Sequence, residues 1–370
     1  MSRLALLLAS ICVALVGAEF SLYALGKYDD VAQAALVRSE AIWERPPSVV
    51  QYRDHPDLNY KVEIRFDKYG VRNHGQLSTK EKKNIIAVFG DSFTENRRIN
   101  NDFSFISLLG NMFKRKCNVV NFGVDGYGID QSYLRYKKFS KLNIKHVIYV
   151  LYSNDLSNLY ETGLVEMKAG QVYFRAPRYN WFIHTIGKIR LTYLIIDAYH
   201  HAKRQVGALD IRRESIFPNS INSGYRKRRR NIVADSMIAD FLSKEPNART
   251  THYADVFMNL LKHWRSEARN SGAKFTVVVV PDRLSTALAR KMGVASTFDV
   301  VFLGDAIRDR SNITFRNDRH WNEIGNLRSA LALARSGYFQ SYLRPGLDHS
   351  LIRRQKRSEI ERLYRTYRRR

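Results

Sequence analysis

Short apolar runs rich in β-branched and aromatic residues recur along the chain, and segments with helical periodicity lie between them. The apolar runs are Ile85–Phe89, Asn118–Phe122, His146–Tyr152, Lys274–Val280 and Ile313–Phe315. Helical patterns span Phe103–Phe113 and Tyr253–Arg269, and the second ends before Asn270-Ser271-Gly272, a typical helix stop. Strands that alternate with helices build a parallel sheet covered on both faces. The pattern therefore predicts an α/β domain around a central parallel sheet.

The amino-terminal segment has a different pattern, because Leu4 to Leu25 is apolar except for Ser10, Glu19 and Ser21. About 22 such residues are enough to cross a bilayer as a helix. Val16-Gly17-Ala18 resembles a signal-peptidase site. We expect an uncleaved signal anchor, with a cleaved signal peptide or a buried helix as alternatives. In the first two cases the rest of the chain is exported to the periplasmic or extracellular side.

These patterns divide the chain into four regions. Residues 1–26 are the signal anchor or signal peptide, 27–80 a connecting segment with three prolines, 81–345 the α/β domain and 346–370 a basic tail. About 120 residues separate the third predicted strand from the fourth, which predicts an insertion or lid over about 156–250. The insertion begins with aromatic residues, which suit either stacking on sugars or packing of a lid.

The excess of basic residues indicates which kind of partner the chain binds. The chain of 370 residues has 61 Lys and Arg against 35 Asp and Glu, a net charge of +26, which favours polyanions. Residues 203–230 and 353–370 each contain nine basic and two acidic residues. Export disfavours nucleic acid and favours an anionic envelope surface. In the tail, Ile360, Leu363, Tyr364 and Tyr367 follow helical spacing, so we expect a basic amphipathic helix, either docked on the domain or bound to the membrane surface.

Composition excludes several other classes. A content of 45% hydrophobic and 26% charged residues excludes wholesale disorder and a polytopic membrane protein. Cys12 and Cys117 are the only cysteines, too few for a disulfide framework or a cysteine-based zinc site. The sequence contains neither a phosphate-binding Gly-x-x-x-x-Gly-Lys-Ser/Thr motif nor His-Glu-x-x-His. These absences argue against a P-loop ATPase and leave no motif in the sequence that indicates a cofactor.

Candidate chemistry begins with Gly90-Asp91-Ser92, which follows the first apolar run. Ligands bind at the carboxyl ends of parallel strands, and a glycine allows the sharp turn that aims a serine there. Serine is a weak nucleophile without a base. His320 follows the last apolar run, and Asp318, two residues before it, can accept a hydrogen bond from the imidazole Nδ1 if the loop curls. Taken alone, Gly90-Asp91-Ser92 is more typical of a helix N-cap.

Acyl chemistry also needs hydrogen-bond donors for the developing oxyanion. Gly126 and Asn154 follow the second and third strands and qualify, although turn residues end most strands. Asp91 and Asp155 offer another interpretation, a carboxylate pair acting as acid and base. The serine chemistry instead makes them organisers of the two loops.

Four segments in this order, each at a strand end, resemble the SGNH/GDSL hydrolases. The resemblance covers roughly residues 85–160 and 254–335, and Phe66–Arg72 is similar to the lead-in of membrane-anchored bacterial members. It implies a flavodoxin-like three-layer α/β/α sandwich and an esterase that needs no metal. It also implies roles for individual residues: Ser92 the nucleophile, His320 the base, Asp318 its orienter, and the Ser92 and Gly126 N–H groups with the Asn154 side chain the oxyanion hole.

The sequence departs from the family pattern in two places. The third block usually reads Gly-x-Asn-Asp, whereas Ser153 precedes Asn154 here, and a positive φ at Ser153 would be strained. The last block more commonly has aspartate three residues before the histidine, where this chain has Asn317. Asp318 belongs to an Asp-x-His-Trp-Asn variant found in relatives that acetylate polysaccharides.

We therefore expect an exported, membrane-anchored serine esterase that removes acetyl groups from an envelope or extracellular polysaccharide. If a second sugar hydroxyl replaces water, the same site transfers the acetyl group. The alternatives are a lipid or thioester hydrolase and a non-catalytic polyanion-binding protein. The expected partners are an acylated glycan or other ester, the membrane through the first helix, and an anionic surface through the basic insertion and tail.

Overall fold

The predicted flavodoxin-like α/β fold is confirmed by the structure, a computed structural model of the chain. It describes residues 3–25, 37–72, 84–113, 117–168, 171–176, 189–191, 194–195, 236–307, 309–316 and 318–367. The central sheet contains β5 (Asn84–Gly90), β6 (Cys117–Asn121), β7 (Ile144–Leu151), β10 (Lys274–Val279) and β11 (Asp299–Phe302). All neighbours are parallel and the order is β11-β10-β7-β5-β6. This order reverses direction next to β5, the strand that leads to Ser92.

Four of the five predicted strands are correct to within two residues, but Ile313–Phe315 is not a strand of the sheet. The fifth strand is β11, and Thr314 forms only an isolated antiparallel bridge with Trp321. Ile313 and Phe315 are buried as loop residues. Their apolar character therefore reflects packing against the domain, and three residues are too few for periodicity to distinguish the two cases.

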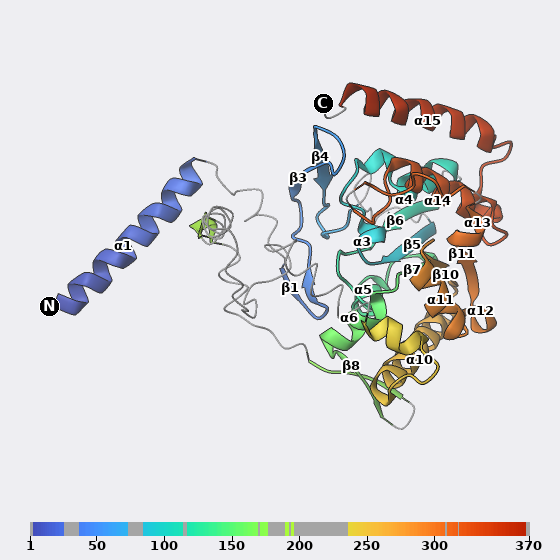
Figure 1. Cartoon of the computed structure of the whole chain (residues 1–370), viewed down its shortest axis with the longest axis horizontal. Coiled ribbons are helices and arrows are strands. Elements are labelled where there is room, and N and C mark those ends of the chain that lie inside the picture. Colours follow the sequence, from blue (N-terminus) through green and yellow to red (C-terminus); the bar gives the residue numbers. More distant parts are fainter. Residues whose placement is uncertain are drawn as a thin grey trace.

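Helices cover both faces of the sheet, as alternation along the buried strands requires (Figure 1). On one face α5 (Ile129–Phe139), α6 (Asp155–Thr162) and α10 (Ala248–Asn270) pack on Ala87 and Phe89 of β5. On the other face α4 (Phe105–Met112) and α14 (Glu323–Arg335) pack on Ile86 and Val88. The two helical patterns expected around 103–113 and 253–269 correspond to α4 and α10.

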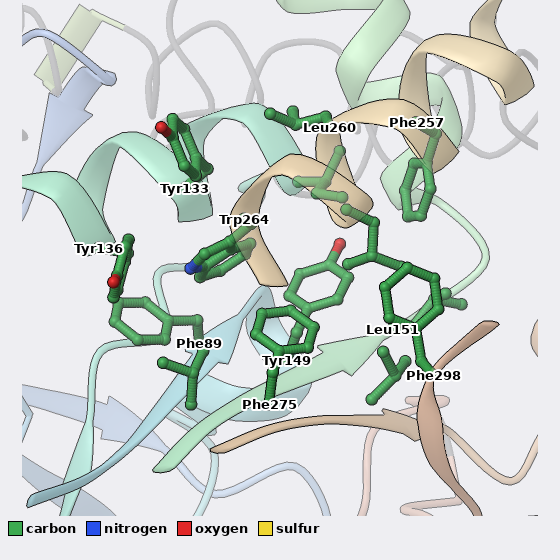
Figure 2. Close-up of a cluster of buried hydrophobic side chains, with 14 of the residues drawn as sticks. Phe89, Tyr133, Tyr136, Tyr149, Leu151, Phe257, Leu260, Trp264, Phe275 and Phe298 are labelled. Atoms are coloured by element: carbon green, nitrogen blue, oxygen red, sulfur yellow. The ribbon is translucent and has the colours of Figure 1, made fainter. Parts of the chain in front are cut away.

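Trp264 of α10 lies at the centre of the first face (Figure 2). Its ring centroid lies 5.3 Å from that of Phe89, 5.5 Å from Tyr149 and 5.5 Å from Phe275, so it joins three adjacent strands. Tilted and edge-on aromatic pairs of this kind add packing energy beyond their buried area. This cluster supports β5 from below the turn that carries Ser92.

Residues 37–72, within the segment expected as a connection, fold onto the α/β domain. They form two antiparallel pairs, β1 (Val37–Ser39) with β2 (Ile42–Glu44) and β3 (Val50–Asp54) with β4 (Lys61–Arg65). Arg45 and Arg72 of this segment are buried beside α3 (Ser92–Glu95). The domain boundaries stay a prediction, but this segment is part of the packing around the site.

The apolar amino-terminal segment is the helix α1 (Arg3–Ala24). It is exposed almost throughout, stands away from the α/β domain in Figure 1, and is long and apolar enough to cross a membrane. A signal sequence and an anchor share these properties. Of the insertion expected over 156–250, the structure describes α6, the hairpin β8 (Val165–Lys168) and β9 (Gln171–Phe174), and the segment that leads into α10; its basic run at 226–230 lies outside the described residues.

The basic tail contains a helix, α15 (His349–Thr366), whose apolar face packs on the domain. Ile360 is 2% exposed, and the Tyr364 hydroxyl donates to Glu323 Oε2 at 3.0 Å. The other oxygen of Glu323 lies 3.0 Å from Nε2 of the fully buried His55, in the loop between β3 and β4. Glu323 thus connects the tail helix α15, the loop of the β3–β4 hairpin and the start of α14.

The docked position of α15 predicts that Ile360→Ala lowers the free energy of unfolding by about 2–5 kcal/mol, because a buried methyl-rich side chain leaves a cavity. Leu351→Ala on the exposed side of the same helix is the matched control, since Leu351 is 45% exposed. Denaturant unfolding of the full chain in detergent, followed by tryptophan fluorescence, measures both. Equal denaturant midpoints of unfolding for the two variants would mean that the packing of α15 does not stabilise the domain.

Candidate active site

The turn after β5 places Ser92 at the carboxyl edge of the sheet. Gly90 has φ +148°, and a Cβ there would lie 2.4 Å from Thr94 Oγ1 and 2.9 Å from the Val150 carbonyl oxygen. Only glycine fits such a turn. Asp91 then caps α3, because its Oδ1 accepts the Phe93 N–H at 2.9 Å. The N-cap expected as an alternative is therefore present at Asp91, and Ser92 is the first residue of the helix.

Ser92, His320 and Asp318 form a continuous chain of contacts. His320 Nε2 lies 2.7 Å from Ser92 Oγ, and His320 Nδ1 hydrogen-bonds Asp318 Oδ1. The same Asp318 oxygen accepts the His320 backbone N–H at 2.9 Å. An ionised carboxylate only accepts, so Nδ1 carries the imidazole proton and Nε2 accepts from the serine hydroxyl. This is the geometry in which a histidine can remove a proton from serine.

The position of His320 at the sheet edge was predicted, but the reason given was wrong. His320 does not follow a strand of the sheet; it lies in a loop that leads into α14. Asn322 shapes that loop: its Oδ1 caps α14 at the Gly325 N–H, and its Nδ2 donates to the Asn312 and Thr314 carbonyl oxygens at 2.9 and 3.0 Å. The Phe93 ring stacks on the imidazole at 4.8 Å between centroids.

Arg98 sets the charge balance of these side chains, because its Nε donates to Asp318 Oδ2 at 2.8 Å. Burial alone would raise the pKa of Asp318, but the hydrogen bond to His320 and the nearby charges of His320 and Arg98 hold it well below its ordinary value. For His320, burial and then the Arg98 charge lower the pKa, against the opposing effect of Asp318. The imidazole is therefore neutral at neutral pH.

Two backbone N–H groups at the serine turn and its neighbouring loop are candidate donors to an oxyanion. Within the part of the chain that the structure describes, the N–H groups of Ser92 and Gly126 have no hydrogen-bond partner. Gly126 has φ +82°, and the Val124 N–H donates to the Gly90 carbonyl oxygen at 3.1 Å, which fixes this loop against the turn. The Asn154 side chain, the third expected donor, lies close enough to the Asp91 carboxylate to contribute to lowering its pKa.

Asp91 and Asp155 are buried side by side and titrate abnormally. Burial raises the pKa of Asp91 to about 7, and burial together with the Asp91 charge raises that of Asp155 well above its ordinary value. Asp155 Oδ2 accepts from the Tyr149 hydroxyl at 2.6 Å and from the Tyr152 N–H at 3.0 Å. Each carboxyl thus organises the loop in which it lies, and Asp91 Oδ2 lies 3.3 Å from Ser92 Oγ.

Sequence reasoning missed a buried ionic cluster around Glu95. Arg45 donates to both Glu95 oxygens at 2.6 and 2.9 Å, and Arg97 Nε lies 3.0 Å from Glu95 Oε2. Burial would raise the Glu95 pKa, but the two arginines lower it below the ordinary value. Glu95 Oε2 also accepts the Asp125 N–H at 2.8 Å. The carboxylate therefore holds the loop that presents the Gly126 N–H.

A second arginine from the amino-terminal segment braces the end of α3. Arg72 donates to the carbonyl oxygens of Glu95 at 2.6 Å, Asn96, and Ile99 at 2.7 Å. Its approach depends on the turn before it, where Asp67 Oδ1 accepts two backbone N–H groups and Gly70 has φ +66°. The Phe66–Arg72 lead-in was the signal in the sequence from which this brace could have been found.

The two departures from the family pattern have separate outcomes. Ser153 does not adopt positive φ, so the expected strain is absent, and its N–H donates to Ser285 Oγ at 2.9 Å. Asn317 lies outside the described residues, whereas Asp318 makes the contact with His320. Among the described residues no group of three or more His, Cys, Asp or Glu is placed to hold a metal ion.

Comparison with known proteins decides the class. Residues 86–188 match the family model of the GDSL-like lipase/acylhydrolases. The chain contains a GDSL-like lipase/acylhydrolase domain. It is accordingly an ester-bond hydrolase, as the resemblance implied. The sequence has no match among curated proteins.

Three solved structures similar to this chain are described as lipolytic or esterase proteins. A lipolytic G-D-S-L protein from Desulfitobacterium hafniense is 11% identical, covering 68% of this chain and 99% of that one, with a TM-score of 0.36. A psychrotrophic esterase from Pseudoalteromonas sp. is 10% identical, covering 70% of this chain and 99% of that one, with a TM-score of 0.36. An acetylxylan esterase from Geobacillus stearothermophilus is 10% identical, covering 70% of this chain and 95% of that one, with a TM-score of 0.35.

The Glu95 cluster predicts that Glu95→Gln lowers the free energy of unfolding by about 3–5 kcal/mol, because two buried arginine charges lose their counter-charge. Glu63→Gln is the control, since the Glu63–Arg65 pair is exposed. Denaturant unfolding compares the two variants with the native chain. If both variants unfolded at the same denaturant concentration, the Glu95 cluster would not contribute to the stability of the fold.

Proposed function

We propose that the chain is an exported, membrane-anchored serine esterase that removes O-acetyl groups from an envelope or extracellular polysaccharide. The observation that carries this proposal is the chain of contacts from Ser92 through His320 to Asp318. The apolar helix α1 supports anchoring, and the flavodoxin-like sheet supports a site that opens at the edge where its strands end. The hydrolase class is established by the GDSL-like domain; the substrate and location are the proposal.

In the proposed reaction, Ser92 Oγ attacks the ester carbonyl carbon while its proton passes to His320 Nε2. Asp318 stabilises the imidazolium, and the Ser92 and Gly126 N–H groups donate to the oxyanion, with the Asn154 amide at its edge. The carbon–oxygen bond to the sugar then breaks, and His320 returns the proton to the leaving hydroxyl. Water, deprotonated by His320, next attacks the acyl-enzyme and releases acetate and free Ser92.

The confined surroundings of the serine support a small acyl group. Ser92 is 6% exposed, and the Phe93 ring lies between His320 and the Tyr152 ring, whose centroid is 4.5 Å away. Two charged groups, Arg98 and Asp125, also lie close enough to His320 to affect its pKa, and such surroundings suit a polar alcohol better than an alkyl chain. An acetylated sugar satisfies both conditions.

Ser92→Ala in the purified full chain should lower acetate release from p-nitrophenyl acetate by about 10⁴-fold or more, because the acyl-enzyme cannot form. Ser140→Ala, at the exposed end of α5, is the matched control and should keep full activity. A series of p-nitrophenyl esters from acetyl to palmitoyl tests which acyl group the site accepts.

Preference for long chains would favour a lipid hydrolase, and a labelled acyl-enzyme without hydrolysis would favour a transferase. If neither ester hydrolysis nor an acyl-enzyme were detected, a non-catalytic binding protein would be the remaining interpretation.

The lowered pKa of His320 predicts the acid side of the pH profile. Catalysis needs the neutral imidazole, so kcat/KM should stay on its plateau as pH falls through the ordinary histidine value of about 6.5 and decline only below it. Arg98→Gln removes a charge that lowers the His320 pKa, so its acid limb should shift to higher pH. Steady-state rates across pH measure both profiles. A native acid limb above that value, or a shift to lower pH in the variant, would contradict the assignment.

A further inference from the structure

Arg53 lies on the β3–β4 hairpin, near the residues that hold the loop of Gly126. Arg53 lies two residues after Gln51 on β3, and alternate residues of a strand share a face. Gln51 is buried, and its Oε1 accepts from Arg97 Nη1 at 3.3 Å. Arg97 in turn lies 2.9 Å from Asp125, the residue before Gly126. Arg53 is therefore on the face of the hairpin that borders the oxyanion loop.

The charges around this hairpin do not balance. Arg45 and Arg97 share the carboxylates of Glu95 and Asp125, and Arg98 pairs with Asp318. Among the described residues, the guanidinium of Arg53 has no ion pair or hydrogen bond, and its side chain is exposed.

The field at Arg53 is repulsive. The charge of Arg97, then partial desolvation by the neighbouring groups and the charge of Arg45, lower the Arg53 pKa to about 9, so Arg53 is still a cation at neutral pH. The charges of Asp125 and Glu95 oppose this lowering but are the smaller effects. Beside it, Gln51 Nε2 is a buried donor without a partner among the described residues. A bound anion would relieve this repulsion.

We propose that Arg53 is an anion subsite of the esterase, which binds the carboxylate of an acidic sugar next to the acetyl ester. This inference rests on the proposed function, because it names the glycan class that the Ser92 centre would act on. The planar guanidinium matches a carboxylate in a paired hydrogen bond. The neighbouring polar and charged groups, Gln51, Arg97 and Asp125, favour a sugar over an acyl chain at this position.

The test compares two substrates that differ only in charge, the acetylated methyl glycosides of glucuronic acid and of glucose. The native chain should have a higher kcat/KM on the acidic sugar, and Arg53→Gln should reduce the ratio of the two values about five- to tenfold. Arg53→Lys should restore part of the ratio. Arg65→Gln, an exposed arginine on β4 of the same hairpin, is the matched control and should keep the native ratio.

Salt provides a second readout. An exposed charge pair is screened as the Debye length falls from about 10 Å at about 0.1 M to about 3 Å at about 1 M ionic strength. The preference of the native chain for the acidic sugar should shrink over this range, whereas the ratio for Arg53→Gln should change little. Equal rates on both sugars, or an acidic preference that Arg53→Gln leaves intact, would overturn the subsite.

A binding measurement separates failure of the subsite from failure of the proposed function. Two inactive proteins are compared by calorimetric titration: the Ser92→Ala variant and the Ser92→Ala/Arg53→Gln double variant, neither of which can hydrolyse an ester. Each is titrated with oligoglucuronate and with a neutral glucose oligomer. If no sugar ester is hydrolysed but Arg53-dependent binding of oligoglucuronate persists, the esterase function fails and the anion subsite stands. If neutral esters are hydrolysed through Ser92 but binding does not depend on Arg53, the subsite fails alone. Arg53-dependent preference for an anionic lysolipid over both sugars would overturn the assignment to a sugar.

Discussion

The buried carboxylate of Glu95 is the interaction on which the arrangement of the site depends. Glu95 ends the short helix that Ser92 begins, and it binds Arg45 from the amino-terminal segment and the Asp125 N–H from the loop after β6. Three segments distant in sequence therefore meet at one charged group. A buried carboxylate is costly unless its partners are all present, so the serine turn and the oxyanion loop are held in place only when the amino-terminal segment is docked.

The base is positioned by a different set of contacts at the other end of the chain. The loop that carries His320 ends at α14, whose first residue, Glu323, binds both His55 and Tyr364. The tail helix and the hairpin loop thus contact the residue three positions after the imidazole. The nucleophile is held from the amino-terminal side through Glu95, and the base from both ends through Glu323, which explains why segments outside the sheet are packed so closely on it.

Much of the fold was predictable because buried parallel strands leave a strong signal: β5, β6, β7 and β10 each contain consecutive buried apolar residues. β11 was missed because Asp299–Phe302 is a short edge strand, half-exposed along most of its length, while Ile313 and Phe315 are apolar for loop packing. Local motifs identified Ser92, His320 and Asp318, since each lies in a distinctive short pattern. Glu95 and Arg45 have no such pattern: their roles arise from a contact across 50 residues, which periodicity and spacing do not encode.

The shared use of Asp318 by His320 and Arg98 has a chemical consequence. An aspartate that bound His320 alone would favour the imidazolium and raise the histidine pKa. Burial of the imidazole lowers the His320 pKa most, and Arg98, which shares the carboxylate of Asp318 and adds its own repulsion, lowers it further. The imidazole becomes a weaker base, but it is in the reactive neutral form over a wider pH range. Since efficiency depends on the product of basicity and neutral fraction, Arg98 sets the compromise between them, and the same arginine keeps Asp318 ionised when the imidazolium forms.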